Sequence, residues 1–537
     1  MKNDDSNLIL DRIVAAGRQR GITRRHFMQN ATATGLTAAA AATLWTNEVS
    51  AMTPSQGGNF RVAIHDANTT DTMDPGQYLS VFMIQLAHAS RSYLTEVNPD
   101  GTLGPDLADS WTASPDAKVW TFELNKNATF HDGRPVTSND VLASLRHHLG
   151  EESASAAKSL LANVTDVRAD GDHTVVIELD TGLADLPYIM TDYHIAMVPA
   201  DADGKADWAG GMGSGPYKVD NFNAGVSAKL TKHEGWHRDG GYFDSIELIA
   251  INDPNARQTA LVSGDVDAVS SVDLKTLALL ERRAGISILN LPSGSAVTLP
   301  MHVTQAPFDN NDVRMALKLA INRDELIEKI VFGTATPGND FHISPNMPYY
   351  PDDIPQRTHD PDKAKWHLKQ AGMDSLSLDM SASDSIMPGA VDFVTLFSEQ
   401  AKAANINIKP IREPGDGYWA DVWLKKPFIF SKWGARPTPD TMFTLAYKTG
   451  ASWSEAFWSN ERFDELLLQA KAELDDTKRA EMYREMSLIA RDDGGTILPM
   501  FTNYVYAHQD TVAHPENVGS TWELDGARAY QRWWFKG

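Results

Sequence analysis

The sequence predicts an α/β protein of two to four domains, and three observations lead to this prediction. The chain has 537 residues, which is long enough for several hydrophobic cores. Residues 59–65 and 119–124 alternate apolar with other side chains, a pattern typical of strands. Residues 137–150 and 313–321 carry apolar residues at helical spacing. Because we find neither an internal repeat nor a low-complexity linker, we expect the domains to be continuous with one another or interleaved.

The first 51 residues have the pattern of an export signal rather than of a folded domain. Arg24 and Arg25 precede a weakly apolar, Ala/Thr-rich stretch over residues 31–45, and Val49-Ser50-Ala51 supplies the small residues of a cleavage site. The pattern resembles a twin-arginine signal, which implies a bacterial-type cell envelope. An uncleaved anchor is the alternative, but about 15 such residues fall short of the ~20 that span a bilayer. We therefore predict a periplasmic protein whose signal, residues 1–51, is cleaved after Ala51.

The composition argues against several classes of function. The chain carries 71 acidic and 48 basic residues, a formal net charge of −23, whereas nucleic-acid binding needs a basic face. It has no cysteine, so disulfides and thiolate chemistry are impossible. Beyond the signal, no apolar run is long enough to span a membrane. The 14 Trp and 14 Tyr residues suit a protein with a binding cleft, where aromatic rings serve as walls.

Motifs of common enzymes are absent from the sequence: there is no HExxH, no G-x-S-x-G and no phosphate-binding loop. Residues 212–219 are glycine-rich, but Pro216 and a strand-like run follow where a phosphate loop needs a helix. His147 and His148 are adjacent on a predicted helix, so they diverge, and we interpret them as surface residues. We expect no metal, no cofactor and no enzymatic activity. A hydrolase is the alternative, because an Asp/Glu pair distant in sequence leaves no signature.

The most distinctive block runs from residue 103 to residue 141. It contains Leu103–Trp111, a turn at Ser114–Ala117, the strand-like Val119–Leu124, a tight turn at His131–Gly133, and a helix capped by Thr137 with Asp140 three residues on. The order and spacing of these residues resemble the extracellular solute-binding proteins of ABC importers, family 5, the dipeptide/oligopeptide/nickel class. Pro115 and Asn125 depart from the family pattern, but neither lies at an expected ligand contact.

Further matches extend the resemblance from about residue 58 to the end of the chain. They are the run Gly213–Tyr217, Trp236-His237 with Phe243–Ile246, the helix and turn of residues 256–268, a helix pair that begins at Pro307 and continues from Asn322, and Asp360–Lys365. The resemblance implies an α/β fold of the type II periplasmic-binding-protein class, with two lobes around a hinge and an extra inserted domain (cluster C type). Ligand then lies between the lobes, and closure seals it.

The resemblance also implies how the chain is divided and what it contacts. We expect a discontinuous N-terminal lobe of residues 58–90, 210–290 and 503–537, an inserted domain of residues 91–209, and a second lobe of residues 291–502. The predicted function is that of the periplasmic solute-binding component of an ABC importer. A monomer would capture a small peptide or peptide-like solute and deliver it to the membrane permease and its ATPase.

Residues 433–440 are the main candidate for a ligand contact. They follow a short apolar run, Phe428–Phe430, that we expect to be a buried strand, and two prolines stiffen their backbone. Trp433 would form a flat apolar wall beside the donors of Arg436. In peptide-binding members of the family, a W-x-x-D segment occurs here, and its Asp pairs with the peptide ammonium. This chain has Arg436 at that position.

The inverted charge predicts a ligand with an anionic group. An arginine that faces an ammonium in a closed cleft would cost several kcal/mol. Either the ligand carries a carboxylate near Arg436, or its amine is held elsewhere, for instance by Asp440. The remaining ligand-binding candidates are Tyr78, Phe82, Arg412, Tyr418 and Trp419.

Several alternatives stay open. The Trp-Gly-Ala opening of residues 433–435 is also similar to nickel-binding members of the family, so the ligand could be a nickel chelate. An opine or an oligosaccharide is a further alternative within the same family. Outside transport, the protein could serve a receptor in chemosensing or in peptidoglycan recycling, or it could be the hydrolase considered above.

Overall fold

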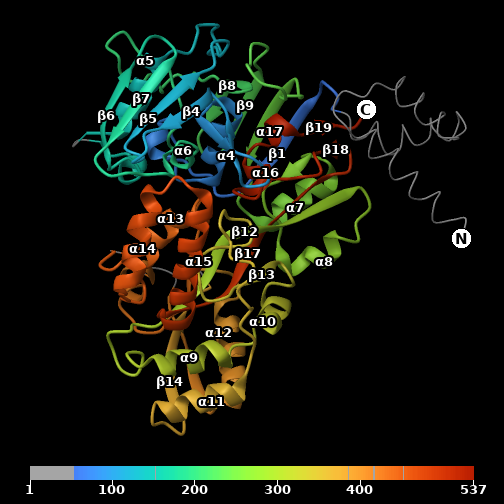
Figure 1. Ribbon diagram of the computed structural model, residues 1–537. Coiled ribbons are helices and arrows are strands. Elements are labelled where there is room, and N and C mark those ends of the chain that lie inside the picture. Colours follow the sequence, from blue (N-terminus) through green and yellow to red (C-terminus); the bar gives the residue numbers. More distant parts are fainter. Residues whose placement is uncertain (1–53, 151–152, 385, 415–417, 452) are drawn as a thin grey trace, which may run out of the picture.

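The computed structural model describes residues 54–537, except 151–152, 385, 415–417 and 452 and the side chains of residues 419 and 420. The predicted export signal and its cleavage site lie outside these residues. The described chain forms two lobes and an inserted domain (Figure 1). Within it, none of the helices combines the length and the apolar character needed to cross a membrane.

The largest sheet has nine strands and joins segments that are far apart in the sequence. Its order is β16-β12-β17-β11-β1-β10-β9-β8, and β13 pairs with β17. The strands are β1 (Asn59–Ile64), β8 (Tyr217–Asn223), β9 (Ser227–Lys232), β10 (Ser245–Ala250), β11 (Ala268–Val269), β12 (Ile286–Pro300), β13 (Ala335–Pro337), β16 (Ser431–Trp433) and β17 (Thr496–Gln509). β1 is parallel to β10 and β11, and it confirms the strand predicted at residues 59–65.

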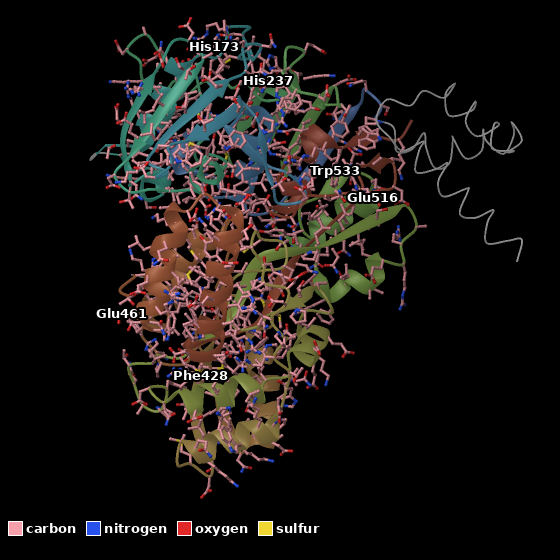
Figure 2. All side chains as sticks on the ribbon, in the orientation of Figure 1. His173, His237, Phe428, Glu461, Glu516 and Trp533 are labelled. Carbon is pink, nitrogen blue, oxygen red and sulfur yellow. The ribbon has the colours of Figure 1, made fainter. Side chains whose placement is uncertain are left out.

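The first lobe packs short helices and the C-terminal segment onto this sheet. These elements are η3 (Pro75–Gln77), α4 (Val81–Ser90), α7 (Pro254–Ser263), η5 (Leu274–Thr276), α8 (Leu277–Leu280), β18 (Val512–Ala513), α16 (Glu523–Gly526), α17 (Ala529–Arg532) and β19 (Trp534–Phe535). Trp533, labelled in Figure 2, is fully buried in the same core as Phe60 and Tyr506. The C-terminal segment therefore completes the core that the first strand begins.

The inserted domain has its own antiparallel sheet, in the order β4-β5-β7-β6. Its elements are β2 (Thr95–Val97), β3 (Leu103–Pro105), β4 (Ala108–Ala113), β5 (Val119–Leu124), α5 (Ser138–His148), η4 (Ala156–Ser159), β6 (Val164–Ala169), β7 (Thr174–Leu179) and α6 (Leu186–Ile189). The predicted cap of α5 is confirmed, since the backbone N–H of Thr137 donates to Asp140 Oδ2 at 2.8 Å. His148 is fully buried, so its interpretation as a surface residue was wrong.

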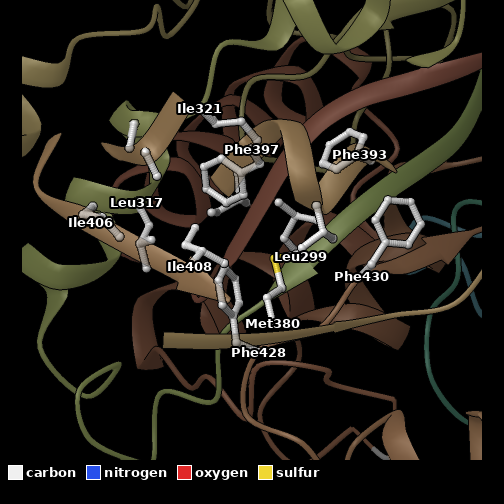
Figure 3. Close-up of a cluster of buried hydrophobic side chains, with 14 of the residues drawn as sticks. Leu299, Leu317, Ile321, Met380, Phe393, Phe397, Ile406, Ile408, Phe428 and Phe430 are labelled. Carbon is white, nitrogen blue, oxygen red and sulfur yellow. The ribbon is translucent and has the colours of Figure 1, made fainter. Parts of the chain in front are cut away.

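The second lobe is mostly helical. Its elements are α9 (Asn311–Ala320), α10 (Arg323–Ile330), α11 (Pro361–Gln370), β14 (Leu376–Ala382), α12 (Ala390–Ala401), η6 (Lys402–Ala404), β15 (Ile406–Arg412), η7 (Tyr418–Val422), α13 (Pro439–Ala446), α14 (Glu461–Ala472) and α15 (Asp476–Asp493). Asn322 caps α10 as predicted, by accepting from the Glu325 N–H at 3.1 Å. Figure 3 shows Leu317 of α9, Phe393 and Phe397 of α12 and Phe428 in one buried cluster.

Two long strands connect the lobes. β12 and β17 pair along most of their length, with register shifts between Leu291 and Ser295 and between Val297 and Leu299. Figure 1 shows both strands at the centre of the molecule, between the upper and lower parts. The predicted lobe boundaries at residues 290/291 and 502/503 fall inside these strands. The division into lobes stays a prediction, because both boundaries lie within strands that run on without a break.

The segment that carries the main candidate residues folds differently from its prediction. Phe428 and Ile429 form only isolated bridges, and the strand β16 begins at Ser431, so the strand lies a few residues later than expected. Trp433 ends this strand. Thr438 then caps α13, whose first residue is Pro439. Asp440 is therefore in the first turn of a helix and not in a loop.

Candidate interlobe ligand site

A cavity of about 380 Å³ lies where the first lobe, the inserted domain and the second lobe meet, within the size range of small-molecule sites. The inserted domain lines it between residues 188 and 194, and the first lobe between residues 520 and 528. The second lobe contributes residues 346–348, the loop 435–437 and Trp453. Gly294 of β12 borders the same space, and a Cβ there would lie 3.3 Å from Ala435 Cβ. Glycine therefore lets the Arg436 loop approach β12.

Arg436 is the cation of the second-lobe wall. Its Nη1 donates to the carbonyls of Gly434 at 3.2 Å and Ala435 at 3.0 Å, and its guanidinium lies 5.9 Å from the centre of the Trp433 ring. Among the described residues, no carboxylate oxygen lies within 4.0 Å of it. Burial lowers the pKa of Arg436, and the charges of Tyr193, Asp192 and Tyr504 oppose that shift. The site thus holds a partly desolvated cation whose donors are only partly used.

Aromatic rings form the apolar part of the wall. Tyr193 and Trp522 come from the inserted domain and the first lobe, and their rings meet edge-on at 5.5 Å. On the second lobe, Trp453 lines the cavity and is 44% exposed. Its ring lies 6.0 Å from that of Trp433, which is buried behind it. Flat rings on both sides of the cavity suit an extended solute with apolar portions.

A second cation in the cavity wall, Arg528, already has partners. Arg528 lies 3.1 Å from Glu96 and 3.5 Å from Asp106, and all three side chains are buried. Although burial alone would raise it, the pKa of Glu96 is lowered to about 2 by Arg528 and Arg238. His88 also lines the cavity, and burial together with Arg528 lowers its pKa to about 3, so it is neutral at pH 7. Arg528 is therefore neutralised by the protein, in contrast to Arg436.

Of the seven candidate side chains that the structure describes, Arg436 is the one that lines this cavity. Trp433 lies behind the wall, 5% exposed, against Ala296 and Phe501. Asp440 is buried and faces away from the cavity, toward Asp185 and Arg479. Burial, together with the Asp185 charge, raises the pKa of Asp440 to about 7.

Four other candidates, whose side chains are described, lie apart from the cavity. Tyr78 and Phe82 are buried in the first-lobe core, and Tyr78 donates to the Met73 carbonyl at 3.2 Å. Arg412 is exposed and pairs with Asp384 at 2.9 Å. Tyr418 is buried and donates to the Phe430 carbonyl at 2.8 Å. Trp419 belongs to η7, and its side chain lies outside the described set. Whether any of these residues binds ligand stays a prediction.

The residues that sequence reasoning missed are Asp192, Tyr193, His194, Trp453, Trp522 and Arg528. They come from three separate segments, and none belongs to a short motif with its own chemical meaning. Asp192-Tyr193-His194 does concentrate two ionisable side chains and an aromatic within three residues, which is the one local signal that was available. No group of three or more His, Asp or Glu side chains in the described part of the chain could hold a metal ion.

Comparison with known proteins agrees with this architecture. The family model described as "Bacterial extracellular solute-binding proteins, family 5 Middle" matches residues 102–455. Among curated proteins, the chain is similar to the glutathione-binding protein GsiB of Escherichia coli (strain K12). The two are 27% identical over 467 residues, which cover 81% of this chain and 88% of GsiB.

Solved structures share the fold. The periplasmic binding protein DppA from Helicobacter pylori, in complex with the peptide STSA, has a TM-score of 0.71 at 21% identity and covers 90% of this chain and 99% of its own. AgaA from A. tumefacien R10, in complex with agropinic acid, has a TM-score of 0.70 at 21% identity. It covers 89% of this chain and 99% of its own. The expected type II periplasmic-binding-protein fold of the cluster C type is confirmed. Because the family model matches most of the length of this chain, the chain belongs to the bacterial extracellular solute-binding proteins of family 5.

Proposed function

We propose that the protein is the periplasmic binding component of an ABC importer and that its ligand is a small peptide-like solute with a carboxylate. The observation that carries the choice of ligand is Arg436, a cation in the wall of the interlobe cavity with no carboxylate partner in the described chain. A desolvated arginine without a counter-ion is costly. A ligand carboxylate would compensate this cost with charge-assisted, bidentate hydrogen bonds.

The similar proteins support an acidic ligand. GsiB is named for glutathione binding, and the two solved structures hold a peptide and agropinic acid. Each of these molecules carries at least one carboxylate. An opine-like acid is therefore a candidate ligand beside peptides. Nickel chelates are kept as well, since NikZ from Campylobacter jejuni, in complex with Ni(L-His), shares the fold at a TM-score of 0.70.

The wider function follows from the family and from the sequence. The chain would be exported by the twin-arginine pathway, lose residues 1–51, and act in the periplasm as a monomer. It would pass its solute to the permease and the associated ATPase. Its work would be reversible binding and not catalysis, so a bound ligand recovered from the protein is expected to be chemically unchanged. Mass spectrometry of the recovered ligand tests this, because a cleaved product would indicate a hydrolase.

The experiment that tests the proposal is a thermal-shift screen followed by calorimetry. The panel contains glutathione, dipeptides, opines, nickel chelates and oligosaccharides. We expect carboxylate-bearing peptide-like compounds to raise the melting temperature, since a ligand at a hundred times its Kd adds about 2.7 kcal/mol. The same compounds should bind weakly to Arg436→Met. Arg462→Met is the matched control, because Arg462 lies on the exposed face of α14 and pairs with Glu485 at 2.8 Å.

Two results would overturn the proposal. One is a hit whose affinity is the same for Arg436→Met as for the unaltered protein. The other is a panel in which only neutral sugars bind, because a neutral ligand would leave the cavity cation without a counter-ion.

A further inference from the structure

Asp192 is the acidic group of the cavity, and its two oxygens have different surroundings. Oδ1 accepts from the backbone N–H of His194 at 3.0 Å and from His194 Nδ1 at 2.7 Å. Oδ2 accepts no hydrogen bond from the described chain, and the side chain is 26% exposed. Asp192 also lines the cavity. One oxygen therefore fixes the carboxylate, and the other is available to a molecule in the cavity.

His194 holds this carboxylate in place. Its Nδ1 faces Asp192 Oδ1 at 2.7 Å, and its Nε2 faces the carbonyl oxygen of Tyr78 at 2.8 Å. The His194 side chain is buried, and its ring lies between Asp192 and the first-lobe segment that carries Tyr78. Asp192 is therefore attached to the first lobe through His194, and its orientation does not depend on a ligand.

Asp192 and Arg436 face the same cavity from different parts of the molecule. Asp192 follows α6 in the inserted domain, and Arg436 follows β16 in the second lobe. The charge of Asp192 acts on the Arg436 guanidinium, but the two groups do not form an ion pair within 4.0 Å. Opposite charges that share a cavity without touching leave room for a group between them, and that group must complement both.

We propose that Asp192 binds a cationic group of the ligand, so that the ligand is a zwitterion held between Asp192 and Arg436. This inference rests on the proposed function and adds the contact that binds the cationic group of the ligand. The ligand carboxylate lies at Arg436 on the second lobe, and its ammonium lies at Asp192 Oδ2 on the inserted domain. Because the two contacts belong to different sides of the cleft, one ligand of this kind draws both sides together.

This arrangement also answers where the ligand amine is held. The sequence suggested Asp440 as the alternative to the missing W-x-x-D carboxylate. Asp440 is buried in the first turn of α13, near Asp185, and it does not line the cavity. Asp192 does reach it, and it does so from the opposite wall. The ammonium would therefore be bound by the inserted domain and not by the second lobe.

The test pairs a change in the protein with a change in the ligand. The probes are glutathione, the dipeptide Ala-Ala and alanopine, each also in an amine-blocked, N-acetylated form. For the unaltered protein we expect blocking the amine to weaken binding at least tenfold by calorimetry. For Asp192→Asn, which keeps the Oδ1 acceptor for His194, the free and the blocked probes should bind within about twofold of each other. Asp166→Asn, an exposed site on β6, is the matched control.

Folding is separated from binding by melting temperature and by a second variant. Asp192→Glu keeps the charge and should regain part of the preference for the free amine. The inference is overturned if no free-amine probe binds, or if Asp192→Asn still prefers the free over the blocked probe as strongly as the unaltered protein does. If blocked probes bind the unaltered protein as tightly as free probes do, and this binding depends on Arg436, the proposed function stands and this inference fails. If binding does not depend on Arg436, the proposed function itself fails.

Discussion

The inserted domain and the second lobe place opposite charges near each other in two regions, and the two regions handle charge in opposite ways. Near α6, Asp185 and Arg479 are both buried and lie 2.6 Å apart. Beyond the end of the same helix, Asp192 faces Arg436 across the cavity without an ion pair. In the first contact the protein satisfies its own charges, so the contact is structural. In the second it leaves them available, which is what a ligand site requires.

The buried pair offers the largest expected effect. Arg479→Met would leave Asp185 opposite Asp440, two buried carboxylates with their central cation removed. We expect a loss of about 3–5 kcal/mol in the free energy of unfolding, measured by urea denaturation. The double variant Arg479→Met/Asp185→Leu should lose less free energy of unfolding than Arg479→Met alone, because it leaves one carboxylate fewer unpaired. A double variant that is less stable than the single one would show that this contact is not governed by charge.

Arg436→Met should instead leave the stability of the ligand-free protein unchanged and weaken ligand binding. Because the arginine has no carboxylate partner to abandon, the ligand-free variant is expected to melt no lower than the unaltered protein. Ligand affinity should fall by about 2–3 kcal/mol, roughly 30- to 150-fold, since a charged hydrogen-bonded contact is lost. Melting temperature without ligand and calorimetry with ligand separate the two effects. A large drop in the ligand-free melting temperature would place Arg436 with the structural charges.

The contribution of Asp440 to the free energy of unfolding should depend on pH. Burial, with the charge of Asp185, raises its pKa from an ordinary 3.8 to about 7. An acid whose pKa is raised by folding stabilises the fold while protonated, fully below about pH 4, and this contribution is lost as the pH rises to about 7. Asp440→Asn cannot ionise. Its stability relative to the unaltered protein should therefore increase between pH 5 and pH 8, by roughly 2–3 kcal/mol. Urea titrations at the two pH values would show an unchanged difference if Asp440 were already ionised at pH 5.

Trp453 gives the smallest expected effect. It is 44% exposed at the cavity wall, so Trp453→Ala should change the unfolding free energy little. A ligand that packs against the ring should lose about 1 kcal/mol of affinity. Quenching of tryptophan fluorescence on ligand addition should also diminish, because Trp453 is in contact with the cavity. If affinity and quenching are both unchanged, the apolar wall lies elsewhere, with Tyr193 and Trp522 as the next pair to test.

Local sequence patterns were sufficient to predict the family, most of the helices and strands, and one residue of the cavity wall. Helix caps such as Thr137 and Asn322 and the periodicity of α9 depend on residues within a few positions of one another, so the sequence displays them directly. The order of motifs from residue 103 onward is likewise readable, and the family model confirms the resemblance. Arg436 could be singled out because its charge departs from the pattern at a position next to a strand end.

The tertiary structure alone decided which charges are free and which are buried. A helix that starts at Pro439 turns Asp440 away from the cavity, and packing against Ser155 buries His148. Asp192 and Arg436 share one cavity because β12 and β17 bring the second lobe beneath the inserted domain (Figure 1). Desolvation and pairing depend on neighbours that are distant in sequence. The sequence by itself thus determined the class of protein and the unusual cation, and the fold determined what that cation faces.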